Sequence, residues 1–150
     1  MKQYADAYKQ ATDEFLSVAN SLSPADLDRS DAQGWSPRQV IHHMADSETQ
    51  SYARLRRLIA EPGTAIQGYD EGAWADNETL AYATEDIADS VAVIIAVRQS
   101  SYWLISRLTQ PQLTNTCVHS ESGNYTVQDW LTTYTKHPHD HANQIREILG

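Results

Sequence analysis

Apolar residues recur at spacings of three and four residues in four separate stretches of this chain, and this periodicity limits its fold more than any other feature. The stretches cover residues 2–21, 37–60, 84–108 and 126–149, and Gly, Pro, Ser and Asn residues fill the breaks, including a loop at 29–34. We find no internal repeat, low-complexity tract or convincing strand pair. The sequence therefore predicts an all-α, four-helix bundle of the antiparallel type, in a single domain that spans residues 1–150.

Capping residues indicate where three of these helices begin. Ser36 is followed three positions later by Gln39, and Thr126 by Asp129, which is the capping-box pattern in both cases. Thr84 is a candidate cap for the third helix. Because this third stretch is the most apolar of the four, we expect it to lie deepest in the bundle.

A long connection, residues 64–83, joins the second predicted helix to the third. It contains Tyr69 and Trp74, and this aromatic content is unusual for a plain linker. Long ordered connections in compact domains are often functional. We therefore predict that Tyr69 and Trp74 form the wall of a pocket for a cofactor or substrate.

Composition excludes several classes of partner. With 20 acidic and 11 basic residues the net charge is −9, which repels phosphate backbones and anionic membranes, so we expect no nucleic-acid and no membrane partner. The first fifteen residues lack the apolar stretch of a signal peptide, which predicts a cytoplasmic protein. Cys117 is the single cysteine, so a metal site would have to use imidazole and carboxylate ligands.

His137 and His141 are the strongest chemical signal. Four residues apart on a helix, they lie on one face, whereas His139 points to the opposite side. Pro138 lies between them and lacks an amide hydrogen, so it should bend the helix near Tyr134. This spacing suits two metal ligands, and solvated histidines near a helix end are the alternative.

A third ligand could come from His42 or His43, and periodicity alone does not separate them. Either one could instead be hydrogen-bonded at a boundary between helices. Asp46 and Glu48 are the nearby carboxylates. We expect both to be solvated charges, although either could orient a ligand imidazole or carry a proton in catalysis. His119 has no partner at ligand spacing, which predicts a surface position.

Residues 35–48, WSPRQVIHHMADSE, resemble the second-helix signature of the DinB superfamily, in which W-[ST]-x-x-[EQ] leads into a histidine and then a small apolar-Ala-Asp sequence. Three further segments follow in order: YDEGAW at 69–74, HSESG at 119–123, and the H-x-x-x-H pair at 137–141. Together they resemble the YfiT-like branch, also called bacillithiol-transferase-like. The resemblance covers residues 34–150.

The resemblance implies a four-helix bundle that binds a divalent metal, zinc or nickel, through three histidines. Carried over residue by residue, these ligands are His43, His137 and His141. Members of the branch are described as metal-dependent hydrolases, and some resemble thiol S-transferases. Pro138 is a departure in detail from the family's pattern and bears on the geometry of His141.

Three functions follow from such a site. A divalent ion held by three neutral imidazoles keeps its charge and open positions, so it could activate water to hydrolyse a small-molecule substrate. It could equally activate a low-molecular-weight thiol for transfer to an electrophile. Alternatively, the metal could only stabilise a module that forms a homodimer, and a fourth ligand such as Glu48 would favour this reading. The sequence does not choose between water and thiol.

Overall fold

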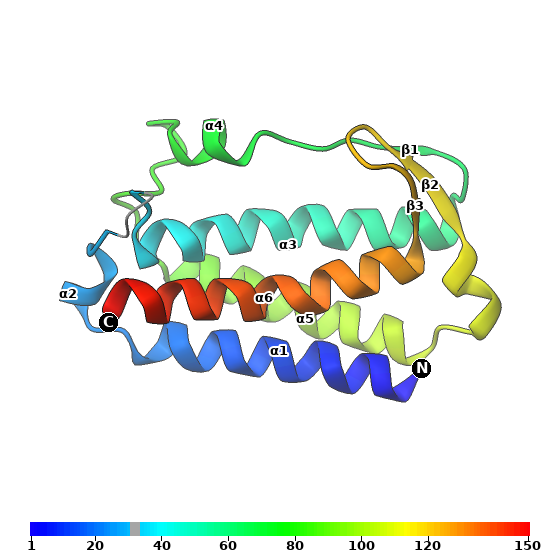
Figure 1. Ribbon diagram of the computed structural model, residues 1–150, viewed down its shortest axis with the longest axis horizontal. Helices are drawn as coiled ribbons and strands as arrows, with labels where there is room; N and C mark the ends of the chain where they lie inside the picture. The colour runs from blue at the N-terminus through cyan, green and yellow to red at the C-terminus, as the bar shows by residue number, and fades with distance from the viewer. Residues whose placement is uncertain (31–33) are drawn as a thin grey trace.

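The computed structural model describes residues 1–30 and 34–150, so positions 31–33 of the loop predicted at 29–34 lie outside the described residues. Its four long helices form a bundle: α1 (Lys2–Ser21), α3 (Pro37–Ala60), α5 (Ala88–Ser106) and α6 (Val127–Leu149) (Figure 1). The short elements are α2 (Pro24–Leu27), α4 (Glu71–Ala75) and the 3₁₀ turn η1 (Gln110–Thr114). The predicted four-helix bundle is confirmed.

The directions of the helices differ from a simple antiparallel bundle. Figure 1 shows α1 and α6 running from right to left and α3 and α5 running from left to right. Contacts join α1 to α5 and α6, and α3 to the same two helices. The neighbours α3 and α5 are therefore parallel, because the connection at 61–87 carries the chain back along α3 before α5 begins.

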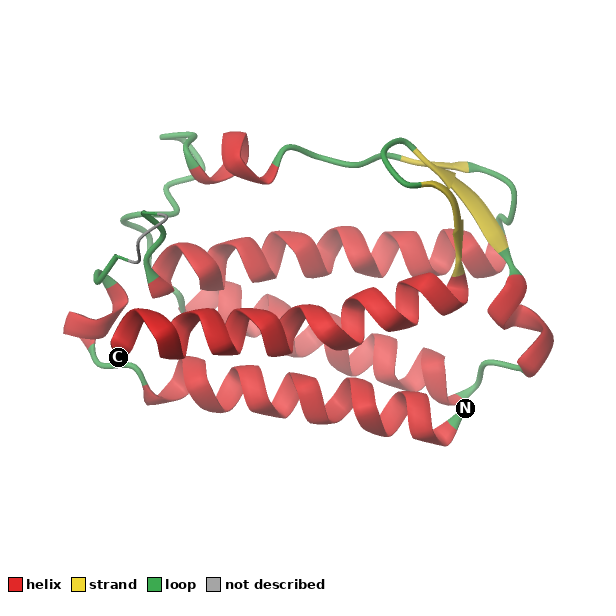
Figure 2. Cartoon of the chain, in the orientation of Figure 1, coloured by secondary structure: helices red, strands yellow, loops and turns green. Residues whose placement is uncertain are grey.

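A small sheet covers one end of the bundle, so the expectation of no strand pair was wrong. The sheet order is β1 (Ala65–Ile66), β2 (Thr116–His119), β3 (Gly123–Thr126), with β1 parallel and β3 antiparallel to β2. Figure 2 shows it where α3 ends and α6 begins. Strands of two to four residues are too short to show an alternating pattern, and β1 pairs with a strand far along the chain.

The two helices that carry the histidine motifs begin where predicted. Ser36 with Gln39 caps α3, Thr126 with Asp129 caps α6, and both form complete capping boxes. Thr84 does not cap α5, which begins four residues later without a side-chain cap. Caps worth about 1 kcal/mol each therefore fix the starts of α3 and α6.

The prediction that the third helix lies deepest was wrong. In α5 the side chains of Ile95 and Trp103 are 48% and 54% exposed, whereas Arg98 is only 1% exposed. The apolar residues of α5 surround the helix instead of forming one stripe, so hydrophobicity alone does not indicate which face is buried. No described helix is both long and apolar enough to cross a membrane.

The core is divided into two apolar clusters along the bundle axis. Tyr8, Leu55 and Trp130 belong to one, and Phe15, Met44 and Ile145 belong to the other. Between them lies a layer of polar side chains, one or two from each of three helices, which we call the polar layer: Thr12, Glu48, Ser51, Arg98 and Ser101. On α6, the stretch between the two clusters contains the paired histidines.

Candidate metal centre

Three imidazoles from two helices converge on one point. Nε2 of His137 lies 3.3 Å from Nε2 of His43 and 3.0 Å from Nε2 of His141. One ligand atom from each residue can be chosen so that all three lie within 4.8 Å of one another. Residues distant in the sequence, on α3 and α6, therefore come together as a metal-sized cluster.

The spacing of these nitrogens fits a coordinated cation. Tetrahedral zinc with nitrogen ligands at about 2.0–2.1 Å places neighbouring nitrogens roughly 3.3 Å apart. Nδ1 of His141 lies 2.8 Å from Oε1 of Gln144. Because an amide oxygen only accepts hydrogen bonds, this Nδ1 carries the hydrogen and leaves the lone pair on Nε2, toward the other rings.

The cluster also favours neutral imidazoles, which are the form that binds metals. Burial, together with the nearby His141, lowers the pKa of His43 to about 3. Burial lowers the pKa of His137 well below its ordinary value, with contributions from its two histidine neighbours and from Arg98. Burial also lowers the pKa of His141. At neutral pH all three rings are therefore neutral, and each carries a lone pair on one of its nitrogens.

His42, the other candidate for the third ligand, lies outside the cluster, and so does His139. Nδ1 of His42 is 2.8 Å from Oγ of Ser90, and its Nε2 is 3.2 Å from the carbonyl oxygen of Glu85. His42 is thus the histidine that is hydrogen-bonded between helices. His139 is exposed and pairs with Glu14 of α1.

A pocket of about 180 Å³ reaches one member of the cluster, His137. Tyr69 lines this pocket. Trp74 is not one of the lining residues, but its ring packs against the ring of Tyr69, with the two centroids 4.5 Å apart. The remaining lining residues come from α3, α4, α6 and the sheet region: Ser47, Arg54, Glu71, His119, Ser122, Tyr125, Thr133 and Tyr134. The long connection at 64–83 therefore supplies part of the pocket wall.

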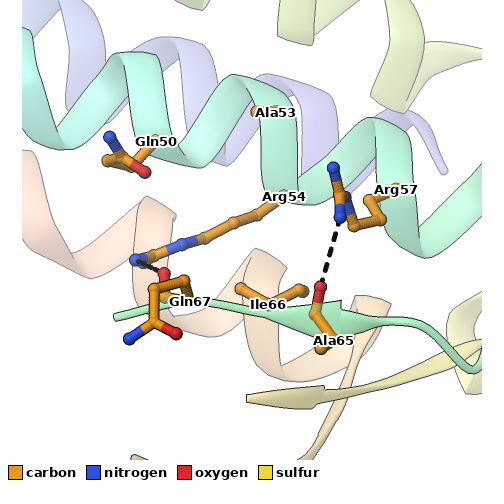
Figure 3. Close-up of a pocket in the computed structure, with 7 residues that line it drawn as sticks. All are labelled: Gln50, Ala53, Arg54, Arg57, Ala65, Ile66 and Gln67. Atoms are coloured by element: carbon orange, nitrogen blue, oxygen red, sulfur yellow. Dashed lines mark hydrogen bonds between the residues drawn. The ribbon is translucent and has the colours of Figure 1, made fainter. Parts of the chain in front are cut away.

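Arg54 lies between this pocket and a second one. Its Nη1 donates to the Tyr134 hydroxyl at 2.8 Å, and its Nη2 donates to the carbonyl of Gln67 at 2.9 Å. The second pocket, of about 240 Å³, is bounded by α3 and β1, and Figure 3 shows Arg54 and Arg57 reaching across it toward that strand. The three histidines do not line it, so it is not the metal pocket.

Glu71 is the acidic residue that lines the pocket with His137. Glu71 is an exposed residue. Partial burial and the nearby charge of Glu121 raise its pKa, and Arg54 opposes this shift. A carboxyl with a raised pKa in the pocket that reaches His137 is a candidate for proton transfer.

The two carboxylates singled out in the sequence lie elsewhere. Asp46 accepts a hydrogen bond from the Tyr82 hydroxyl. Glu48 is 0% exposed and lies 2.6 Å from Nη1 of Arg98, so the expectation of a solvated charge was wrong for this residue. Among the described residues, the cluster of possible metal ligands contains neither carboxylate.

His119 was expected at the surface, and this was wrong. It is 7% exposed, and its Nδ1 accepts hydrogen bonds from the backbone amides of Glu121 and Ser122. No sequence spacing identifies it, because β2 brings it to the pocket. Arg54 was also missed, although it lies eleven residues after His43, which is three helical turns along the same face of α3.

Comparison with known proteins places this chain in a family. The profile of the DinB superfamily matches residues 7–145. The chain belongs to the DinB superfamily. It is 34% identical over 116 residues to the Bacillus subtilis protein named "Putative metal-dependent hydrolase YfiT", a match covering 77% of this chain and 64% of the relative.

A second relative has the same kind of name. "Putative metal-dependent hydrolase OB0782" from Oceanobacillus iheyensis is 33% identical over 115 residues, covering 77% of this chain and 65% of the relative. The matches therefore span slightly less than two thirds of either relative.

The fold of this DinB-superfamily chain also matches a solved structure. The structure of YfiT from Bacillus subtilis, described as "a probable metal-dependent hydrolase with an unusual four-helix bundle topology", superposes with a TM-score of 0.87 and 27% identity. The match covers 98% of this chain and 84% of the other. The parallel α3 and α5 seen here agree with an unusual bundle topology.

Proposed function

We propose that this protein is a metal-dependent hydrolase of small molecules whose ligands are His43, His137 and His141. The observation that carries the proposal is the convergence of the Nε2 atoms of three neutral imidazoles, one of which, His137, lines a pocket. The names of the relatives agree with it. We further propose zinc or nickel as the metal, since imidazole suits both.

When bound, the cation supplies Lewis acidity, which activates water or polarises a substrate carbonyl. Among the residues of the chain, we propose Glu71 as the proton carrier, in preference to Asp46 and Glu48. Glu71 lines the pocket and has a raised pKa. Glu48 instead accepts a hydrogen bond from Arg98, and Asp46 accepts one from the Tyr82 hydroxyl.

The position of Glu48 also bears on the alternative functions. A purely structural metal site, in a module that forms a homodimer, would gain support from a fourth protein ligand. Glu48 is committed to Arg98, Ser51 and Tyr8 instead, which favours an open site and therefore a catalyst. A low-molecular-weight thiol in place of water as the attacking group is the second enzymatic candidate, and we propose the cytoplasm as the location for either activity.

The test combines metal analysis with a substrate screen. The purified protein is analysed for bound metal and assayed with panels of esters and amides, and with electrophiles plus thiols, with and without a chelator. We expect one metal per chain and chelator-sensitive hydrolysis, both lost in His43→Ala and retained in His139→Ala. Full metal content in H43A would contradict the ligand assignment, and turnover only with a thiol would replace hydrolysis by transfer.

A further inference from the structure

Arg98 connects all four long helices from within the polar layer. Projecting from α5, its guanidinium donates to Oε1 of Glu48 on α3 at 2.6 Å and to Oγ1 of Thr12 on α1 at 2.5 Å. Its Nη2 donates both to the carbonyl of Tyr8 on α1 at 3.1 Å and to the carbonyl of Tyr134 on α6 at 3.2 Å. Every nitrogen of the guanidinium therefore has a partner.

The bond to Tyr134 has a specific cause in the sequence. In a regular helix the amide of residue 138 would donate to the carbonyl of Tyr134, but Pro138 has no amide hydrogen. Both residues are buried, and a buried carbonyl without a donor is costly. Arg98 supplies the missing donor from a neighbouring helix.

The same turn of α6 carries the proposed metal ligands. Pro138 lies between His137 and His141, so the carbonyl held by Arg98 precedes the first ligand by three residues. The position of this turn decides whether both rings face His43 on α3.

We propose that Arg98 is the positioning residue of the metal centre: through the Tyr134 carbonyl that Pro138 leaves without a helical donor, it fixes the turn of α6 that presents His137 and His141 to His43. This inference rests on the proposed metal site. Arg98 is not one of the proposed ligands and does not line the pocket that reaches His137, so it would act through the α6 backbone.

The buried partner explains why an arginine is needed. Glu48 is fully buried and offsets the charge of Arg98, so the pair can occupy the centre of the bundle. Lysine could preserve this charge pairing, but its single ammonium group cannot reproduce the planar fork that reaches Glu48 and two backbone carbonyls at once. The variant Arg98→Lys therefore separates the charge pair from the backbone contact.

The test is a titration of the metal-free protein with Co²⁺, followed by visible absorption and by competition with a chelator. We expect R98K to bind Co²⁺ about 10- to 100-fold more weakly than the wild type, with an altered absorption spectrum. In Pro138→Ala the amide of residue 138 is restored, so adding R98K to P138A should cost no more than about threefold.

Arg56→Lys provides the matched control, because Arg56 also joins α3 to α5, through Oγ of Ser100 at 2.9 Å. We expect the Co²⁺ affinity of R56K to stay within about twofold of the wild type, because the contact of Arg56 with Ser100 involves none of the three histidines. If R98K does not fold, the same cycle uses the uncharged pair R98Q/E48Q with and without P138A.

The outcomes separate this inference from the proposed function. If the wild type does not bind Co²⁺, or if the variant H43A binds it as tightly as the wild type does, the metal site itself is wrong. If the wild type binds through His43 and R98K binds equally well, Arg98 has no positioning role. An equal loss with and without P138A would also overturn the proposal, because Arg98 would not act through the Tyr134 carbonyl.

Discussion

Nδ1 of His141 lies 2.8 Å from Oε1 of Gln144, three residues further along α6. This hydrogen bond fixes the tautomer of the ring and directs the lone pair of Nε2 toward His137. Such outer partners of ligand histidines commonly tune metal affinity and ring orientation. Gln144 is therefore placed to orient one ring of the proposed metal centre.

We predict that Gln144→Leu weakens binding of Zn²⁺ by about tenfold, because the ring loses its orienting acceptor. Competition with a chromophoric chelator measures this affinity. Asn143→Leu is the control, since Asn143 contacts His139, which is outside the cluster, and its affinity should be unchanged. Equal affinities for Q144L and the wild type would remove Gln144 from the site.

The depressed histidine pKa values predict that the metal-free protein loses stability in acid. In the folded state the pKa of His43 is about 3, against an ordinary value of 6.5, so between these values the unfolded chain binds the proton more readily. The contribution of neutral His43 to the free energy of unfolding is fully present above about pH 6.5. It is lost as the pH falls, with a slope of up to about 1.4 kcal/mol per pH unit for one proton.

Urea unfolding of the metal-free protein at a series of pH values measures this slope. In His43→Asn the free energy of unfolding should depend less steeply on pH between about 6.5 and 3, because the variant lacks one of the histidines whose protonation folding opposes. His139→Asn is the control, because that ring is exposed and lies outside the cluster. Parallel curves for H43N and the wild type would show that His43 protonates freely in the folded protein.

Breaking the buried ion pair should be far more damaging than breaking a surface pair. Glu48→Ala leaves the guanidinium of Arg98 buried without its counterion, which typically costs about 3–5 kcal/mol of unfolding free energy. Urea denaturation measures the loss. Lys9→Ala, which breaks the exposed pair with Asp13, should cause only a small change. Similar losses in the two variants would mean that Glu48 and Arg98 are not paired as described.

The sequence alone predicts the parts of this molecule that local rules control. Ser36 and Thr126 sit in capping boxes whose signals are complete within four residues, so the starts of α3 and α6 could be predicted. The spacing of His137 and His141 placed them on one face. His43 was separated from His42 by a family resemblance and not by periodicity, because both lie at the edge of the apolar face.

The features that were missed depend on contacts between distant segments. Arg98 lies in the most apolar helix, and nothing near it in the sequence indicates that Glu48 and Tyr134 would meet it in the core. His119 reaches the pocket only because β2 pairs with β1, whose residues lie about fifty positions earlier. Binary patterning assigns charged residues to the surface, and it fails where a buried partner compensates the charge.

Glu71 and Glu121 together give a final prediction about the proposed hydrolysis. If Glu71 carries the proton, Glu71→Gln should lower kcat/KM by about 100-fold or more while metal content stays unchanged. Glu121→Gln acts in a different way. The charge of Glu121 helps to raise the pKa of Glu71, so its removal lowers that pKa and keeps Glu71 ionised to a lower pH.

The acidic limb of the kcat/KM profile should therefore move to lower pH in E121Q, with little loss of the maximal rate. Profiles of the wild type and E121Q, recorded with the same metal, measure the shift. Glu121 also lies against the backbone at Gly68, so a change in that loop would alter the maximal rate and leave the limb in place. A limb that does not move, or full activity in E71Q, would assign the proton transfer to another group.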